Sequence, residues 1–415
     1  MAGRLRLAAT GVQDQWLTGE PQFSYFLMNY KRHTKFAVDY IESQFDGKID
    51  FGEVLDCRIP NDKGDLIRNM TLKVTLTDPA PDTAGRNDTV WSPSIISHLI
   101  EYAELIIGGQ VIERITGEYI YLQQQLNNTN DDTEQTLYFL NGHGNILSYQ
   151  GQYTYFVDLP FYFHRNPTLA IPTCALTKQL VEVKIKTRPL AELIYGGKGL
   201  YSTPSTYEQD ITGTINKFSL DTEFVYVDSD ESNFLKSNPI DYVITQVQLS
   251  KFKMKPGENE KEVLLKFSHP VKELLFVSQS EESVQNNYPN EYNTITNVEL
   301  RFNNEVVFNR NEKFLVYEQS LKHHINSPLV KEFNIGFPFN NSAFTFGPAR
   351  FAMYSFSLKP DVHYPTGQVN MSRIAHKSLR MKINPINSVD SNNTRVYAIN
   401  YNVLRIQSGL AGLIF

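Results

Sequence analysis

Hydrophobic and polar side chains alternate one by one along several short stretches of this sequence. Residues 70–76, 181–185 and 243–249 carry an apolar or β-branched side chain at every second position, and a proline follows closely after each of the first two. Period-two alternation is typical of half-buried strands in antiparallel sheets. In the third stretch, Val243, Val247 and Leu249 are predicted to share the buried face. We therefore predict a mainly β protein built from sandwiches or barrels.

A ten-residue segment that begins at Ala103 recurs at Val298 without a gap, an offset of 195 residues (298 − 103). The centre of the segment is Gly108-Gly109 in one copy and Asn303-Asn304 in the other. A two-residue hairpin of type I′ needs positive φ at both central positions, which Gly permits and Asn tolerates. Because the offset is as long as a domain, the pattern predicts a duplicated domain. Chance similarity between two hairpins is the alternative.

Turn-rich segments suggest where the domains meet. Residues 228–239 are acidic and turn-rich, and they follow a strand pattern over residues 215–227. We predict an N-terminal arm over residues 1–35, a first domain over 36–228, a linker over 229–239 and a second domain over 240–415. Residues 129–133, 196–206 and 285–293 are predicted to be loops between strands.

The charge balance limits the range of partners. Lys and Arg number 39 against 45 Asp and Glu, a formal charge of −6, whereas coating nucleic acid needs clustered cations. Residues 1–228 contribute −9 (19 − 28) and residues 229–415 contribute +3 (20 − 17). This asymmetry fits either solvated faces or an acidic half that abuts the basic half of a neighbouring copy in a head-to-tail ring.

No pattern of catalytic or metal-binding residues stands out. The sequence has no His-x-His pair, and the adjacent His323 and His324 would point to opposite faces of a strand. Cys57 and Cys174 lie in no zinc-binding pattern, and we interpret them as ordinary thiols of a reducing compartment. We predict no catalytic residue, no cofactor and no metal. Two carboxylates on one sheet face could still imitate a glycosidase, and that alternative stays open.

Residues 30–36 place three cations and a histidine between aromatic residues, a mixture that can bind nucleic acid. Since the chain is acidic, we favour the interpretation that these cations protect a strand edge from aggregation.

No stretch approaches the roughly 18 apolar residues of a membrane span, and the first residues lack a secretory signal pattern.

Separated groups of residues resemble the motifs of the major capsid proteins of nucleocytoplasmic large DNA viruses, above all the algal-virus and iridovirus kind. These groups are residues 18–26 and 30–37, the hairpin 104–111, and residues 353–360, 365–367, 370–374 and 401–409. Lys31 departs from the family, which usually has Arg there. The chain is also near the short end for the family, so we expect trimmed outer loops.

The resemblance implies an all-β double jelly roll, in which two consecutive eight-stranded antiparallel jelly rolls follow an N-terminal arm, with short helices in loops. It implies homotrimers that form pseudo-hexagonal capsomers, and neighbouring capsomers that tile the facets of a large icosahedral shell over an internal membrane. The chain would be a structural protein of the virion, made and assembled in the host cytoplasm, with no direct contact to nucleic acid.

The arm is expected to contact minor capsid proteins or the internal membrane. It contains Arg4, Arg6 and Trp16, residues 1–35 carry a net charge of +3 (5 − 2), and no strand pattern occurs there. Two other functions stay open. One is a minor capsid paralogue of the same fold, and the other is a jelly-roll carbohydrate-binding protein with a groove of aromatic platforms.

Overall fold

The alternating stretches form long antiparallel strands in the computed structural model of the chain. The structure describes residues 2–28, 30–77, 90–92, 94–127, 140–142, 152–164, 166–195, 213–285, 291–324, 334–335, 344–345, 351–385 and 389–415. Residues 1–36 and residues 37–415 are two separate parts of the chain. The first part holds helices α1 (Ala2–Ala8) and α2 (Gln15–Thr18), and all its described residues are exposed. Of residues 30–36, for which a strand edge was predicted, only Phe36 lies in a strand, where it begins the edge strand β1.

The first half of residues 37–415 forms a sandwich of two four-stranded sheets. One sheet has the order β1 (Phe36–Gln44), β10 (Thr214–Val227), β3 (Leu66–Thr77) and β7 (Gln152–Asp158). The other has the order β2 (Val54–Ile59), β8 (Val181–Thr187), β5 (Ile100–Ile107) and β6 (Gln110–Thr116). The predicted inward faces of residues 70–76 and 181–185 are confirmed, since their alternate apolar side chains are fully buried.

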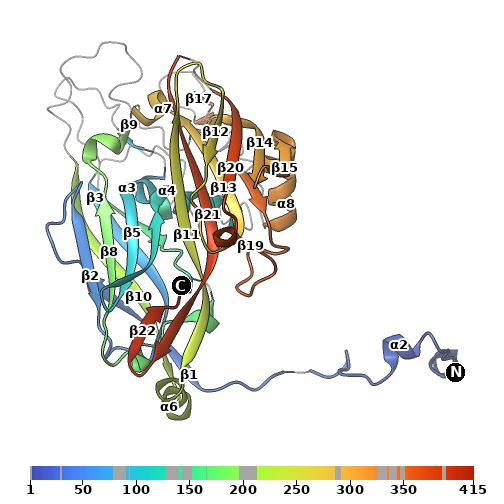
Figure 1. Ribbon diagram of the computed structural model, residues 1–415. Helices are drawn as coiled ribbons and strands as arrows, with labels where there is room; N and C mark the ends of the chain where they lie inside the picture. The colour runs from blue at the N-terminus through green and yellow to red at the C-terminus, as the bar shows by residue number, and fades with distance from the viewer. Residues whose placement is uncertain are drawn as a thin grey trace. The chain divides into compact units, whose positions relative to one another are not determined.

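The second half forms a sandwich beside the first (Figure 1). Its two sheets have the same strand order as those of the first. Its first sheet contains β11 (Ile240–Met254), β21 (Asn392–Gln407), β13 (Pro270–Ser280) and β18 (Ala352–Ser355), with β19 (Val369–Asn370) beside β13 and β22 (Leu410–Leu413) beside β21. Its second sheet contains β12 (Glu260–Leu264), β20 (Lys377–Asn384), β14 (Thr294–Phe302) and β15 (Glu305–Asn311). The repetition of both sheet orders confirms the predicted duplication and the double sandwich.

Short elements connect and flank these strands. Two-stranded pairs are formed by β4 (Val90–Trp91) with β9 (Ile194–Tyr195) and by β16 (Asn334–Ile335) with β17 (Phe344–Thr345). The helices are α3 (Ile95–Leu99), α4 (Gly117–Asn127), α6 (Ser229–Ser237), α7 (Glu281–Gln285) and α8 (Gln319–His323), the last preceded by the π-helical turn η4 (Lys313–Glu318). Single 3₁₀ turns are η1 (Pro167–Leu169), η2 (Thr173–Ala175), η3 (Leu190–Glu192) and η5 (Met371–Arg373). Within the described ranges, no helix is both long and apolar enough to span a bilayer.

The two predicted hairpins have the backbone that their sequences demand. Gly108 and Gly109 connect β5 to β6 with φ of 57° and 81°, and Asn303 and Asn304 connect β14 to β15 with φ of 50° and 70°. Positive φ at both central residues turns the chain with the right-handed twist of the flanking strands. In both copies a helical segment follows the second strand of the hairpin, α4 in the first and η4–α8 in the second.

Two predictions need correction. Within residues 243–249 of β11 the fully buried side chain is Ile244, whereas Val243 is 39% exposed. The predicted linker is no turn-rich coil, because most of it forms α6. Asp228 accepts a hydrogen bond from the Ser229 amide, acidic residues occupy the first turn and Lys236 the last, and all three features favour a helix. The loops predicted at 129–133 and 196–206 lie outside the described residues, as does most of 285–293.

Candidate functional site: the junction between the two sandwiches

The first sheet of the second sandwich is buried on both faces. On β13, alternate side chains enter different cores: Leu274 and Phe276 belong to the core of the second sandwich, and Leu275 and Val277 extend the core of the first. All four are fully buried. A strand covered on both sides needs apolar side chains on both sides, so the sequence there is continuous rather than alternating. The two sandwiches therefore share one sheet as a common wall.

The neighbouring strand β21 repeats this arrangement. Val396 and Ala398 point into the second core, whereas Tyr397 and Ile399 pack with the first. Figure 1 shows β11, β13 and β21 between the first sandwich and the second sheet of the second sandwich. The shared wall fixes the relative position of the two halves through apolar burial, the dominant favourable contribution to folding.

Polar contacts join the two halves around this wall. The Gln246 side chain on β11 donates to the Ile112 carbonyl oxygen on β6 at 2.5 Å. The Ala411 amide on β22 donates to the Gln179 side-chain oxygen at 2.7 Å. The end of the chain is thereby tied to a loop of the first sandwich.

A buried ion pair crosses the junction between α4 and β21. Arg395 Nε and Nη2 donate to the two carboxylate oxygens of Glu118, each at 2.6 Å, and both side chains are about 15% exposed (15% and 14%). The hydroxyls of Tyr397 and Tyr292 donate to the same carboxylate. The bidentate geometry and the extra donors satisfy a carboxylate that is only 14% exposed.

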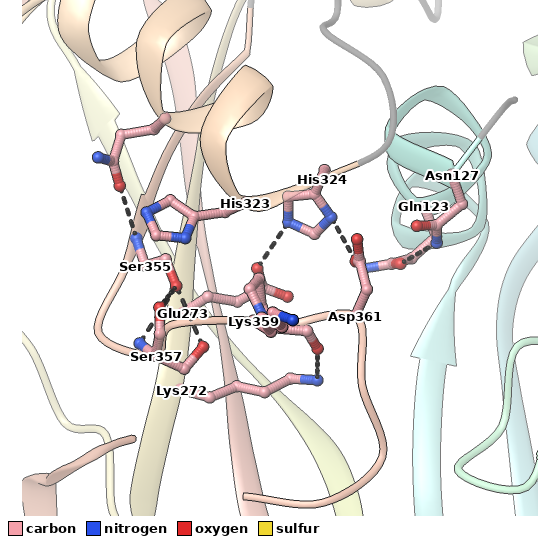
Figure 2. A network of polar contacts seen from close by, with 12 residues as sticks. Gln123, Asn127, Lys272, Glu273, His323, His324, Ser355, Ser357, Lys359 and Asp361 are labelled. Carbon is pink, nitrogen blue, oxygen red and sulfur yellow. Dashed lines mark hydrogen bonds and ion pairs between the residues drawn. The ribbon is translucent and has the colours of Figure 1, made fainter. Parts of the chain in front are cut away.

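A second charged group lies where α8 meets β13 (Figure 2). His324 Nε2 is 3.0 Å from Glu273 Oε2, and His324 Nδ1 is 2.6 Å from Asp361 Oδ1. Burial alone would lower the pKa of His324, but the carboxylates of Glu273 and Asp361 outweigh it and raise the pKa to about 9. The ring is therefore a cation at neutral pH, and its positive charge keeps the pKa of the buried Glu273 below its usual value.

Lys272 and Glu113 extend this group toward the first sandwich. Lys272 Nζ donates to the Pro360 carbonyl oxygen at 2.7 Å, and its burial lowers the pKa of the amine. Glu113 on β6 accepts from the Tyr162 amide at 2.8 Å. Burial raises the pKa of Glu113 to about 8, although the Tyr162 amide and Lys272 act in the opposite direction. The loop over residues 358–361, β13 and β6 thus meet in a charged centre with little access to water.

This arrangement suits holding parts together rather than catalysis. A histidine whose pKa is about 9 is a poor general base at neutral pH. No group of three or more His, Cys, Asp or Glu with metal-binding geometry occurs among the described residues. His323 and His324 lie at and just after the end of α8 rather than in a strand. Cys57 and Cys174 are unpaired thiols, and burial raises the pKa of Cys57 to about 12.

A cavity of about 670 Å³ lies beside the Glu118–Arg395 pair. It is lined by several tyrosines, which a carbohydrate-binding groove would use as platforms. Tyr121, Tyr292 and Tyr397 are however at most 5% exposed, and the Arg114 guanidinium covers the ring of Tyr102 at 3.9 Å. The tyrosines therefore pack within the protein instead of offering open ring faces.

Comparison with known proteins shows the family of this chain. A family model described as "Major capsid protein N-terminus" matches residues 24–228, and one described as "Large eukaryotic DNA virus major capsid protein" matches residues 231–412. The chain belongs to the major capsid protein family of large eukaryotic DNA viruses. The major capsid protein of Pyramimonas orientalis virus is 29% identical, with 100% of this chain and 99% of the relative aligned. That of Paramecium bursaria Chlorella virus 1 is 28% identical over the full length of both chains.

Solved structures agree on the fold of this capsid protein. The Paramecium bursaria Chlorella virus 1 protein VP54, in a crystal structure fitted into a reconstruction of the virophage Sputnik, matches with a TM-score of 0.76 at 21% identity. The match covers 94% of this chain and 100% of that one. The Faustovirus major capsid protein matches with a TM-score of 0.74 at 11% identity, covering 96% and 94%. The chain is thus a double jelly roll, and its relatives are structural components of viral capsids rather than enzymes.

The charged groups of this capsid protein's junction were not found by sequence reasoning. Glu118 and Arg395 are 277 positions apart, so no local pattern relates them. The shared wall did leave a signal: residues 274–277 are an unbroken apolar run, unlike the alternating stretches 70–76 and 181–185. Such a run indicates a strand that is buried on both faces.

Proposed function

We propose that this capsid protein forms homotrimers, in which six jelly rolls make a pseudo-hexagonal capsomer. Neighbouring capsomers tile the facets of a large icosahedral shell. The observation that carries the proposal is the pair of sandwiches with identical strand order joined through one shared wall. Two similar bodies held rigidly side by side supply one third of a six-fold outline, so three chains close it.

The solution mass tests this proposal. Light scattering of the purified protein should give about 143 kDa (3 × 47.6 kDa). Electron microscopy of the same sample should show particles with a six-sided outline. A stable 47.6 kDa monomer at all accessible protein concentrations would contradict the proposal.

The proposal includes the organisation and partners of the chain. Residues 36–228 and 240–415 are the two jelly rolls, residues 229–239 join them, and residues 1–35 are an arm. The arm exposes apolar side chains next to its cations, with Trp16 89% exposed. It contacts minor capsid proteins or the internal membrane, whereas the shell itself, assembled in the host cytoplasm, touches no nucleic acid.

Deleting residues 1–17 tests the role of the arm. The truncated protein should keep its trimer mass but fail to assemble shells when it replaces the full chain in infected cells. Normal shells made from the truncated protein would contradict this role, and loss of the trimer would place the arm in the capsomer itself.

A further inference from the structure

The cavity of about 670 Å³ beside the Glu118–Arg395 pair is lined by both sandwiches. Its wall on the first sandwich comes mainly from α3, β5, β6, the start of α4 and residues 188–192. Its wall on the second comes mainly from β11, β13, α7 and β21. Cavities of about 300–1,000 Å³ are the usual size of binding sites for small organic molecules. A molecule held there would contact both halves of the chain at once.

The acidic side chains that line the cavity already have basic partners. Glu118 accepts hydrogen bonds from one arginine and two tyrosines. Glu101 pairs with Lys186 at 2.8 Å, and Glu192 pairs with Arg188 at 3.3 Å. Each carboxylate of the described cavity wall is thus neutralised within the chain, so a cationic ligand would have to compete with these partners.

The guanidinium of Arg188 has one edge without an acceptor. Its Nη1 donates to Glu192, whereas its Nε is buried and no described residue accepts from it. Arg395 uses the same edge of its own guanidinium, Nε and Nη2, to hold the Glu118 carboxylate. This side-on geometry suits carboxylates and phosphates, which accept two parallel hydrogen bonds. The Arg188 side chain is 28% exposed, so a ligand in the cavity can reach its guanidinium.

Other groups around the cavity also favour a negatively charged acceptor. Ser97 on α3 is 1% exposed, and its hydroxyl has no hydrogen-bond partner among the described residues, which is rare for a buried polar group. Lys251 on β11 forms no ion pair with any described residue, unlike Arg114, which pairs with Glu104 at 3.5 Å. His98 adds no positive charge, because burial lowers its pKa to about 3. The cavity therefore has an excess of hydrogen-bond donors and one uncompensated cation, Lys251.

We infer that this cavity binds a small organic anion, whose carboxylate or phosphate lies on the Nε–Nη2 edge of Arg188. The body of the ligand packs against Val247, Leu249 and Val284, which supply apolar surface in the same cavity. Lys251 provides a second positive charge. Because Arg188 belongs to the first sandwich and Lys251 to the second, the ligand links the two halves of the chain. The site lies within one chain, so this inference goes beyond the proposed trimer and does not depend on it.

Phenyl phosphate and benzoate are suitable probes, because each carries one anionic group on an apolar ring. Isothermal titration calorimetry of the purified protein should give one site per chain for at least one of them, and the tighter probe identifies the preferred anionic group. Inorganic phosphate, which lacks the ring, should bind more weakly than phenyl phosphate. Equal affinity of these two would overturn the apolar contact, and absence of saturable binding of both probes at millimolar concentrations would overturn the site.

Variants of the cavity wall locate the bound probe. Arg188→Lys keeps the charge but removes the side-on edge, so the affinity for the tighter probe should fall about tenfold, as expected for a lost hydrogen bond to a charged group. Lys251→Met should weaken binding roughly two- to fivefold, because its charge is exposed and screened.

Lys253→Met is the matched control for Lys251→Met. Lys253 lies on the same strand and is also exposed, but it pairs with Glu281 at 2.7 Å and does not line the cavity. Both lysine variants should fold like the wild type by circular dichroism, and Lys253→Met should bind the probe with unchanged affinity. Unchanged affinity in either cavity variant, or an equal loss in Lys253→Met and Lys251→Met, would overturn the inference.

Discussion

The ion pair between Glu118 and Arg395 should be one of the stronger single contributions to stability, and the chain offers its own control. Arg405 lies on the same strand, β21, and makes the same bidentate contact with Asp241, at 2.7 Å for both bonds. The two pairs differ in burial: the side chains of Arg395 and Glu118 are 15% and 14% exposed, and those of Arg405 and Asp241 are 51% and 48% exposed.

Arg395→Met removes the charge and keeps most of the side-chain volume. It leaves the Glu118 carboxylate buried without its cation, a change that typically costs about 3–5 kcal/mol of unfolding free energy. Because the hydroxyls of Tyr292 and Tyr397 still donate to Glu118, we expect the lower end, about 3 kcal/mol, or roughly a hundredfold in the unfolding equilibrium. Arg405→Met should have a much smaller effect, since water screens an exposed pair.

Urea unfolding followed by circular dichroism measures both variants, at one fixed protein concentration because association stabilises the folded chain. The midpoint should fall clearly for Arg395→Met and little for Arg405→Met. Equal midpoints for the two variants would refute the reasoning, because burial would then have no influence on the contribution of the pair. The double variant with Glu118→Gln should recover part of the loss, since it removes the unpaired charge.

Three further outcomes follow from the structure. His324 has a folded pKa of about 9, above its unfolded value of about 6.5, so its stabilisation is complete below pH 6.5 and is lost as the pH rises through 9. The unfolding midpoint of His324→Gln should therefore differ from wild type at pH 6 and converge with it above pH 9, and a difference that is independent of pH would contradict this. Leu275→Ala should cost about 2–5 kcal/mol in urea unfolding because it opens a cavity in the shared wall, while Leu264→Ala, at an exposed site, should be close to neutral. Asn304→Ala should cost about 1–2 kcal/mol because alanine is strained at a φ of 70°, whereas Asn304→Gly should not, and equal stability of the two variants would argue against the hairpin geometry.

Much of the fold could be predicted because one physical rule governs most strands. β3 and β8 have one face in a core and the other facing outward, so their sequences alternate and their buried faces are evident. The Gly-Gly and Asn-Asn pairs were equally informative, because few residues tolerate the backbone that they adopt. The same reasoning failed at Val243 of β11, which is 39% exposed. Val247 and Leu249 pack with the first core, as predicted, whereas Phe252 packs with the second. A single alternation cannot describe a strand that contributes to two cores.

The other features that were not predicted left signals in the sequence that were weak or nonlocal. Helix α6 had readable signals in its capping Asp228 and in Lys236 of its last turn, but its acidic composition resembled a loop. The charged junction left no local sequence signal, because His324, Glu273 and Asp361 come from three separate segments that meet only in the folded chain. Contacts of this kind depend on the packing of the sandwiches, which no short stretch of sequence determines.

The tie between Ala411 and Gln179 has a consequence for the timing of biosynthesis. The two residues are 232 positions apart, so Ala411 leaves the ribosome well after Gln179. At about 5–20 residues per second, the nascent chain spends roughly 12–46 s between the two. During that interval the first sandwich can fold, but its apolar side chains around Ile112 remain exposed to solvent until the second half has been synthesised. A host chaperone would have its opportunity to bind then, and translation speed over the second half would influence how much protein aggregates.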